Sequence, residues 1–143
     1  MKTLIAILIC LHVLWVGADV IKNERSRQMF EAAMKQREKC GLSKQVLDKK
    51  LCDQANNWAR YMASIERMVH GGGEQIIAKG YSTPEAAINA WMRSDGHRRW
   101  LLCNRSHVGF GYAVSKNGRK YYAGVYRNKK QNKIVPFVLE GGE

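Results

Sequence analysis

The sequence lacks the features that would identify a membrane protein or a nucleic-acid reader. After residue 18, no apolar stretch is long enough to cross a bilayer. No zinc-finger spacing, basic leucine zipper or RNA-binding signature accompanies the basic residues. Internal repeats and low-complexity segments are also absent. The chain of 143 residues therefore fits one ordinary domain.

Acidic residues are scarce. The chain has 12 of them against 24 lysines and arginines, a formal net charge of +12. The basic residues are scattered, apart from a cluster at residues 127–133. Such an excess favours anionic partners, such as an envelope surface or polymer, nucleic acid or acidic glycans. The charge alone specifies no ligand.

The N-terminus has the pattern of a secretory signal peptide. Lys2 supplies a positive start, an apolar run from Leu4 to Trp15 is broken only by His12, and Val16-Gly17-Ala18 places small residues at the cleavage spacing. We therefore predict a signal peptide at residues 1–18 and a secreted, extracellular or periplasmic protein without a transmembrane segment. Because Lys2 is the only charged residue removed, the mature protein keeps a net charge of +11.

Three cysteines remain in the mature part: Cys40, Cys52 and Cys103. Export permits disulfide bonds, and an odd number leaves at least one thiol over. Three single pairings are open, as is the alternative of three unpaired thiols, and the spacing does not choose among them. Metal binding by these cysteines is disfavoured because no two are close in sequence.

Apolar periodicity predicts helices in the first two thirds of the chain. One helix is expected from residue 22 to 39, and a second after Asp48, a good N-cap. A third should begin at Ser82, whose spacing to Glu85 is that of a capping box. Between the second and third helices, residues 69–75 have the glycine-rich composition of a loop.

The last third is predicted to form a β-hairpin. Residues 108–114 alternate apolar and small side chains, and a second strand is expected from Lys120 to Tyr126. Asn117-Gly118 between them favours a two-residue turn in which both residues take positive φ. Small residues on one strand face suggest that a helix packs closely there. Helices first and strands last indicate an α+β domain.

Several motifs, taken in order, resemble the CAP superfamily of cysteine-rich secretory proteins, antigen 5 and pathogenesis-related group 1 proteins. They are Leu47-Asp48 with Leu51, Ala55 and Trp58-Ala59, then His70, then Gly73-Glu74-Gln75-Ile76, then Trp91-Met92, Ser94 and Gly96-His97-Arg98, and finally Val108-Gly109-Phe110-Gly111-Tyr112 and residues 121–126. The group from Trp91 to Arg98 matches the short bacterial form of the family signature.

The resemblance implies a three-layer α-β-α sandwich at residues 19–127, ending in the β-hairpin. Residues 128–143 would form a basic tail or an edge strand. It also implies one open cleft that gathers His70, Glu74 and His97, with Gln75 and Ser94 beside them. Ser94 stands where animal and plant members carry a second glutamate, so the cleft has three such groups instead of four.

Two imidazoles and one carboxylate are a ligand set of many zinc sites. His70, Glu74 and His97 are therefore expected to be able to hold a divalent metal such as zinc. We predict a non-catalytic module that binds an unknown ligand in this cleft. The alternative is a secreted metal-assisted hydrolase of peptide, glycan or phosphodiester bonds, with Glu74 as general base.

Overall fold

The computed structural model describes residues 24–128. Its elements, in chain order, are α2 (Glu24–Lys39), β1 (Val46–Leu47), α3 (Lys49–Ser64), β2 (Gln75–Lys79), α4 (Pro84–Met92), α5 (Asp95–Leu101), β3 (His107–Val114) and β4 (Lys120–Arg127). The predicted signal peptide at residues 1–18 and nearly all of the predicted tail lie outside the described residues.

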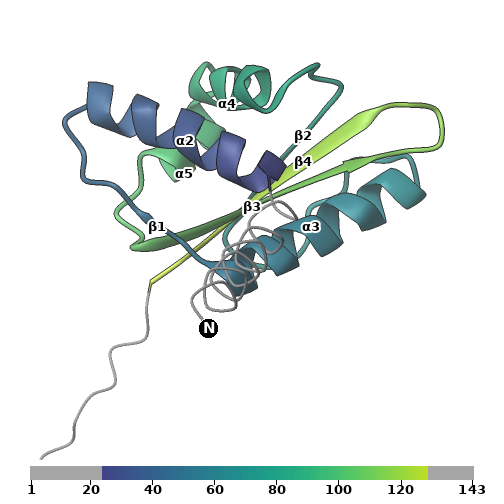
Figure 1. Cartoon of the computed structure of the whole chain (residues 1–143), viewed down its shortest axis with the longest axis horizontal. Helices are drawn as coiled ribbons and strands as arrows, with labels where there is room; N and C mark the ends of the chain where they lie inside the picture. The colour runs from purple at the N-terminus through teal and green to yellow at the C-terminus, as the bar shows by residue number, and fades with distance from the viewer. Residues whose placement is uncertain (1–23, 129–143) are drawn as a thin grey trace, which may run out of the picture.

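A four-stranded sheet separates two helical layers. The strand order is β1-β3-β4-β2. Figure 1 shows α3 alone on one face of the sheet and α2, α4 and α5 on the other. Each face has its own apolar cluster. One joins the strands to α3, and the other joins them to the remaining helices. The predicted α+β class and three-layer α-β-α sandwich are confirmed.

The helix starts are set by side-chain caps. Asp48 Oδ1 accepts a hydrogen bond from the backbone N–H of Leu51 at 2.9 Å, as an N-cap of α3 should. The cap of α4 is Thr83, whose Oγ1 accepts from the backbone N–H of Ala86 at 3.1 Å. The predicted cap at Ser82 was therefore one residue too early.

The predicted hairpin is present, with a different turn. β3 and β4 pair antiparallel from His107↔Arg127 to Val114↔Lys120. Between them only Gly118 has a positive φ, of 79°. The backbone N–H of Gly118 donates to the carbonyl of Ser115 at 2.9 Å, and Ser115 pairs with Arg119. The connection is thus a three-residue loop with one left-handed glycine, which spares Asn117 a positive φ.

The strand β2 was not predicted, because glycines surround it. Its residues pair antiparallel with β4, from Gln75↔Val125 to Lys79↔Tyr121. Gly73 before it and Gly80 after it have φ values of 91° and 87°. These left-handed glycines bring the chain into and out of a strand only five residues long. The loop composition therefore hid the strand that positions Glu74 and Gln75.

Cys40, Cys52 and Cys103 are all free in the structure, which fits the alternative of three unpaired thiols. Cys52 is buried and Cys40 is exposed.

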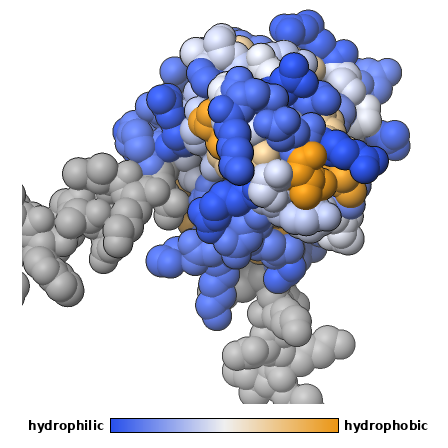
Figure 2. Space-filling model, turned by 90° about the vertical axis from the view of Figure 1, so that its right-hand side faces the viewer, coloured by the Kyte–Doolittle hydropathy of each residue, from blue (hydrophilic) through white to orange (hydrophobic). Residues whose placement is uncertain are grey.

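No helix among residues 24–128 has the length and apolarity needed to span a membrane. Figure 2 shows one face of the molecule as mostly hydrophilic, with small apolar spots.

Candidate functional site

Glu74 lies at the entrance of β2 and is held by two contacts. Its backbone carbonyl accepts from the N–H of Tyr126 at 3.0 Å, which fixes it beside β4. Its carboxylate forms an ion pair and hydrogen bond with the guanidinium of Arg105. Both side chains are about one-third exposed, at 34% and 33%. The carboxylate thus already has a cationic partner within the protein.

His97 is oriented by the residue that precedes its helix. Ser94 is the N-cap of α5, but its side chain caps no backbone N–H. Its Oγ lies 2.8 Å from Nδ1 of His97 instead. The imidazole also stacks near the ring of Trp91, with centroids 6.4 Å apart. Because Ser94 engages Nδ1, the other ring nitrogen, Nε2, is the one that His97 can offer to a ligand.

The structure brings His70 into electrostatic range of His97. Burial lowers the pKa of His97 from its ordinary value, and the charge of His70 lowers that pKa further. His70 itself is exposed, in the segment that follows α3. Two imidazoles separated by 27 positions in the chain therefore interact electrostatically.

A three-ligand metal set is not assembled as the side chains stand. Within residues 24–128, no three His, Cys, Asp or Glu side chains are grouped closely enough to hold a metal ion. Glu74 is engaged with Arg105, while the charge of His70 acts on the pKa of His97. The described residues thus do not fit the full three-ligand set as they stand, and the metal site stays a prediction.

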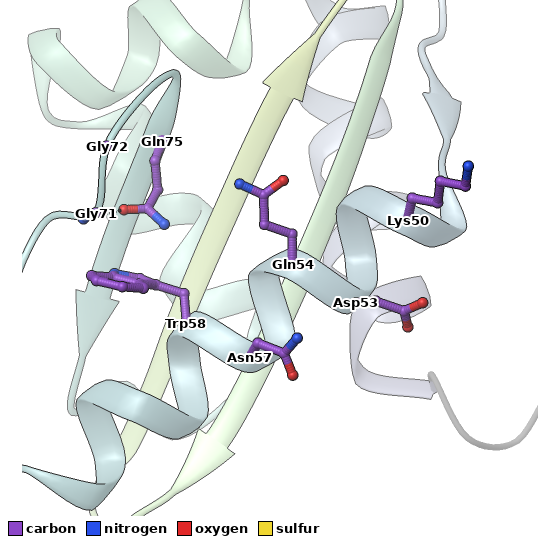
Figure 3. Close-up of a pocket in the computed structure, with 8 residues that line it drawn as sticks. All are labelled: Lys50, Asp53, Gln54, Asn57, Trp58, Gly71, Gly72 and Gln75. Atoms are coloured by element: carbon purple, nitrogen blue, oxygen red, sulfur yellow. Dashed lines mark hydrogen bonds between the residues drawn. The ribbon is translucent and has the colours of Figure 1, made fainter.

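Gln75 lies on the opposite face of β2 from Glu74. Successive strand residues alternate between faces. Gln75 shares the α3 face with Ile77, and Ile76 belongs to the other cluster. The carboxamide Oε1 of Gln75 accepts from the backbone N–H of Gly71 at 2.8 Å. Gln75 therefore lines a different pocket, beside Trp58 (Figure 3).

Arg105 is the residue that sequence reasoning missed. It follows α5, and it lines a pocket of about 540 Å³ together with Gly96, Arg99, Trp100, Cys103 and Asn104. It is separated from Glu74 by 31 positions, so no spacing rule links the two. The sequence signal for this pair is that the two residues carry opposite charges, and many other residue pairs in the chain do so too.

Comparisons with known proteins agree with the fold. The family model described as CAP, the cysteine-rich secretory protein family, matches residues 20–126. The Bacillus subtilis (strain 168) protein YkwD is 52% identical over 40 residues, which are 27% of this chain and 16% of that protein. The chain thus spans far less than two thirds of that relative.

Two solved structures resemble the chain in fold. An outer surface protein from Borrelia burgdorferi has a TM-score of 0.65 at 15% identity, covering 73% of this chain and 92% of that one. An extracellular Bacillus anthracis protein with an SCP domain has a TM-score of 0.61 at 20% identity, covering 73% of this chain and 41% of that one.

Proposed function

Because this chain belongs to the CAP family of cysteine-rich secretory proteins, we propose that it is a secreted, non-catalytic binding module. Its binding site is the cleft around His70, Glu74 and His97, with Ser94 beside them. Export rests on the signal-peptide pattern of residues 1–18. The outer-surface and extracellular proteins of the same fold support that location.

The observation that carries a binding role over a hydrolytic one is the Glu74–Arg105 pair. A general base needs a carboxylate that can take a proton from water or substrate in the transition state. Glu74 would first have to leave the guanidinium of Arg105. Arg105 donates to Glu74 through Nη2, and its remaining N–H groups are suited to hold an anionic group of a ligand, since a planar guanidinium matches carboxylate and phosphate.

The metal proposal rests on the two imidazoles. Nε2 of His97 and the exposed ring of His70 are suitable donors for zinc, and the contact of Ser94 with Nδ1 of His97 is the kind that orients a metal-binding histidine. Zinc bound there would supply a Lewis acid to which a ligand oxygen could coordinate. Glu74 becomes a third ligand only if Arg105 releases it.

Zinc titration by calorimetry tests this, with the full chain and with single variants. We expect wild-type binding to be lost in His97→Ala and strongly weakened in His70→Ala.

Arg105→Gln should tighten binding by about tenfold, because it frees Glu74. Adding Glu74→Gln to Arg105→Gln should remove that gain. His107→Ala is the matched control and should bind as the wild type does. If the wild-type protein binds no zinc, the proposal of a metal site is wrong.

The hydrolase alternative has one observation in its favour, the short contact between Ser94 and His97. A turnover screen with chromogenic peptide, glycoside and phosphodiester substrates, with and without a chelator, separates it from the binding role. We expect no turnover. Turnover that is lost in Glu74→Gln would instead establish the hydrolase.

The net charge supports a second, less specific partner. We propose that an anionic envelope surface or polymer attracts the mature protein through its charge of +11. Sedimentation with vesicles of one-third anionic lipid tests this. Binding should weaken steeply as salt is raised, because exposed charges are screened. Equal binding to uncharged vesicles would contradict it.

A further inference from the structure

A second pocket lies between α3 and the loop that enters β2. It has a volume of about 580 Å³. Its lining residues are Lys50, Asp53, Gln54, Asn57, Trp58, Gly71, Gly72 and Gln75. Neither the two histidines nor Glu74 belongs to that lining. The pocket is therefore a separate candidate site, and Figure 3 shows its side chains coming from α3 on one side and the loop on the other.

Two carboxamides line this pocket, that of Gln75 held by a short hydrogen bond and that of Gln54 in a longer, exposed contact. The backbone N–H of Gly71 donates to Oε1 of Gln75 at 2.8 Å, and the guanidinium of Arg127 donates to Oε1 of Gln54 at 3.5 Å. Both partners can only donate, so each amide oxygen must face its partner and each NH₂ must turn away. In Figure 3 the nitrogens of Gln54 and Gln75 point toward one another. The pocket thus presents two amide donors.

These donors lack acceptors within the protein. Neither amide nitrogen donates a hydrogen bond to any of residues 24–128. Gln75 is only 9% exposed. Neither nitrogen is among the buried side-chain atoms left without a partner, so both are open to the pocket, and an acceptor on a ligand would replace water there. A ligand that brings an acceptor oxygen between Gln54 and Gln75 would therefore be able to accept hydrogen bonds from both.

Trp58, which lies on α3 like Gln54, forms an aromatic wall of the pocket. Nε1 of Trp58 donates to the carbonyl of Val69 at 2.9 Å, which holds the indole in place. Gly71 packs so closely that a Cβ there would lie 3.1 Å from Cε2 of the indole. The ring of Tyr61, 46% exposed, lies 5.0 Å away between centroids and extends the aromatic surface. A ligand with an apolar face can pack against this wall.

The charges in the pocket do not favour an anion. Lys50 is its cation, and the carboxylate of Asp53 opposes it while pairing with Lys49 at 2.9 Å. The remaining donors are neutral amides, which suit uncharged acceptors. A ligand that combines uncharged oxygens with an apolar C–H face is a sugar ring.

We propose that this pocket binds an uncharged carbohydrate chain that carries acetamido groups. A pyranose ring packs against Trp58, and an acetamido carbonyl, which can accept two hydrogen bonds, receives them from Gln54 and Gln75. This site is independent of the histidine cleft, because it uses none of the cleft's groups.

The test uses two tetrasaccharides and calorimetry on the full chain in a chelating buffer. One probe is the β-1,4-linked tetramer of N-acetylglucosamine, and the other is the β-1,4-linked tetramer of glucose, which lacks the acetamido carbonyl. We expect the acetamido tetramer to bind about tenfold more tightly. Gln54→Leu should weaken its binding by about tenfold, because it removes one donor at an exposed helix position.

Gln28→Leu on α2 is the matched control and should bind as the wild type does. His97→Ala should also leave sugar binding unchanged, so failure of the metal proposal does not affect this one. Absence of wild-type binding at about 10 mM sugar overturns the proposal. So does an equal affinity of Gln54→Leu and wild type. If only a sulfated tetrasaccharide binds, and its binding is lost when salt is added, the net charge explains the binding and the proposal is wrong.

Discussion

Gly111 lies directly beneath Ala55, with no room for a side chain between strand and helix. A Cβ on Gly111 would lie 2.1 Å from the carbonyl carbon of Ala55. Two residues earlier on the same face, a Cβ on Gly109 would lie 2.0 Å from the carbonyl carbon of Leu51. The alternating glycines of β3 therefore set how closely α3 approaches the sheet, and α3 in turn carries Trp58, the aromatic wall of the pocket proposed to bind sugar.

Gly111→Ala is expected to destabilise the protein by about 3 kcal/mol or more, because the obstructing atoms are backbone and cannot rotate away. Gly72→Ala is the matched control. Its Cβ would meet nothing within 4 Å, so a change below about 0.5 kcal/mol is expected. Urea unfolding followed by circular dichroism gives both values. Similar stabilities for the two variants would contradict the close packing of α3.

The cap of α4 gives a second paired prediction. Thr83→Ala should lower the free energy of unfolding by about 1 kcal/mol, because Oγ1 of Thr83 accepts from the N–H of Ala86. Ser82→Ala should change it much less, since the contact recorded for Ser82 is made by its backbone carbonyl, with Lys120. Thermal unfolding of both variants distinguishes them. A larger loss for Ser82→Ala would restore the capping box expected from sequence.

The periodic parts of the fold could be predicted from sequence, and the parts set by glycine could not. Asp48 and the alternation from Val108 to Val114 carry local signals that tertiary contacts do not override. β2 carries a weak signal, because two isoleucines between glycines are too few to show a period. Serine and threonine are both good N-caps, so the sequence does not distinguish Ser82 from Thr83. In the folded chain Thr83 is the N-cap of α4.

The family motifs suggested the residues of the candidate site, but no motif encodes how those residues pair. The charge of His70 acts on the pKa of His97, so the segment after α3 and α5 interact electrostatically at these two residues. The partner of Glu74 is Arg105, a contact across the fold that no local pattern encodes. The side chain of Gln75 lies in the other pocket because adjacent strand residues face opposite ways. That consequence requires knowing that β2 is a strand.

The two thiols at opposite extremes of exposure should react at very different rates. Burial raises the pKa of Cys52 above its ordinary value, so little thiolate forms and access is blocked. Cys40 is exposed. With iodoacetamide at about pH 8, Cys40 should be alkylated at least about tenfold faster than Cys52, as read by peptide mass spectrometry. Denaturant should equalise the rates. Equal rates in the native protein would contradict the burial of Cys52.

The lowered pKa of His97 predicts that the protein loses stability in mild acid. Burial and the charge of His70 disfavour the protonated ring in the folded state, while the unfolded chain keeps the ordinary value of about 6.5. As the pH falls below about 6.5, the unfolded chain binds a proton at this imidazole and the folded protein does not. The free energy of unfolding therefore decreases as the pH falls from about 6.5 to the folded pKa. Urea titrations in a chelating buffer between about pH 7.5 and 5.5 should therefore show a steeper loss in wild type than in His97→Asn. His70→Asn should give an intermediate slope, because it removes the smaller of the two causes. A slope in His97→Asn equal to that of wild type would place the acid sensitivity elsewhere in the chain.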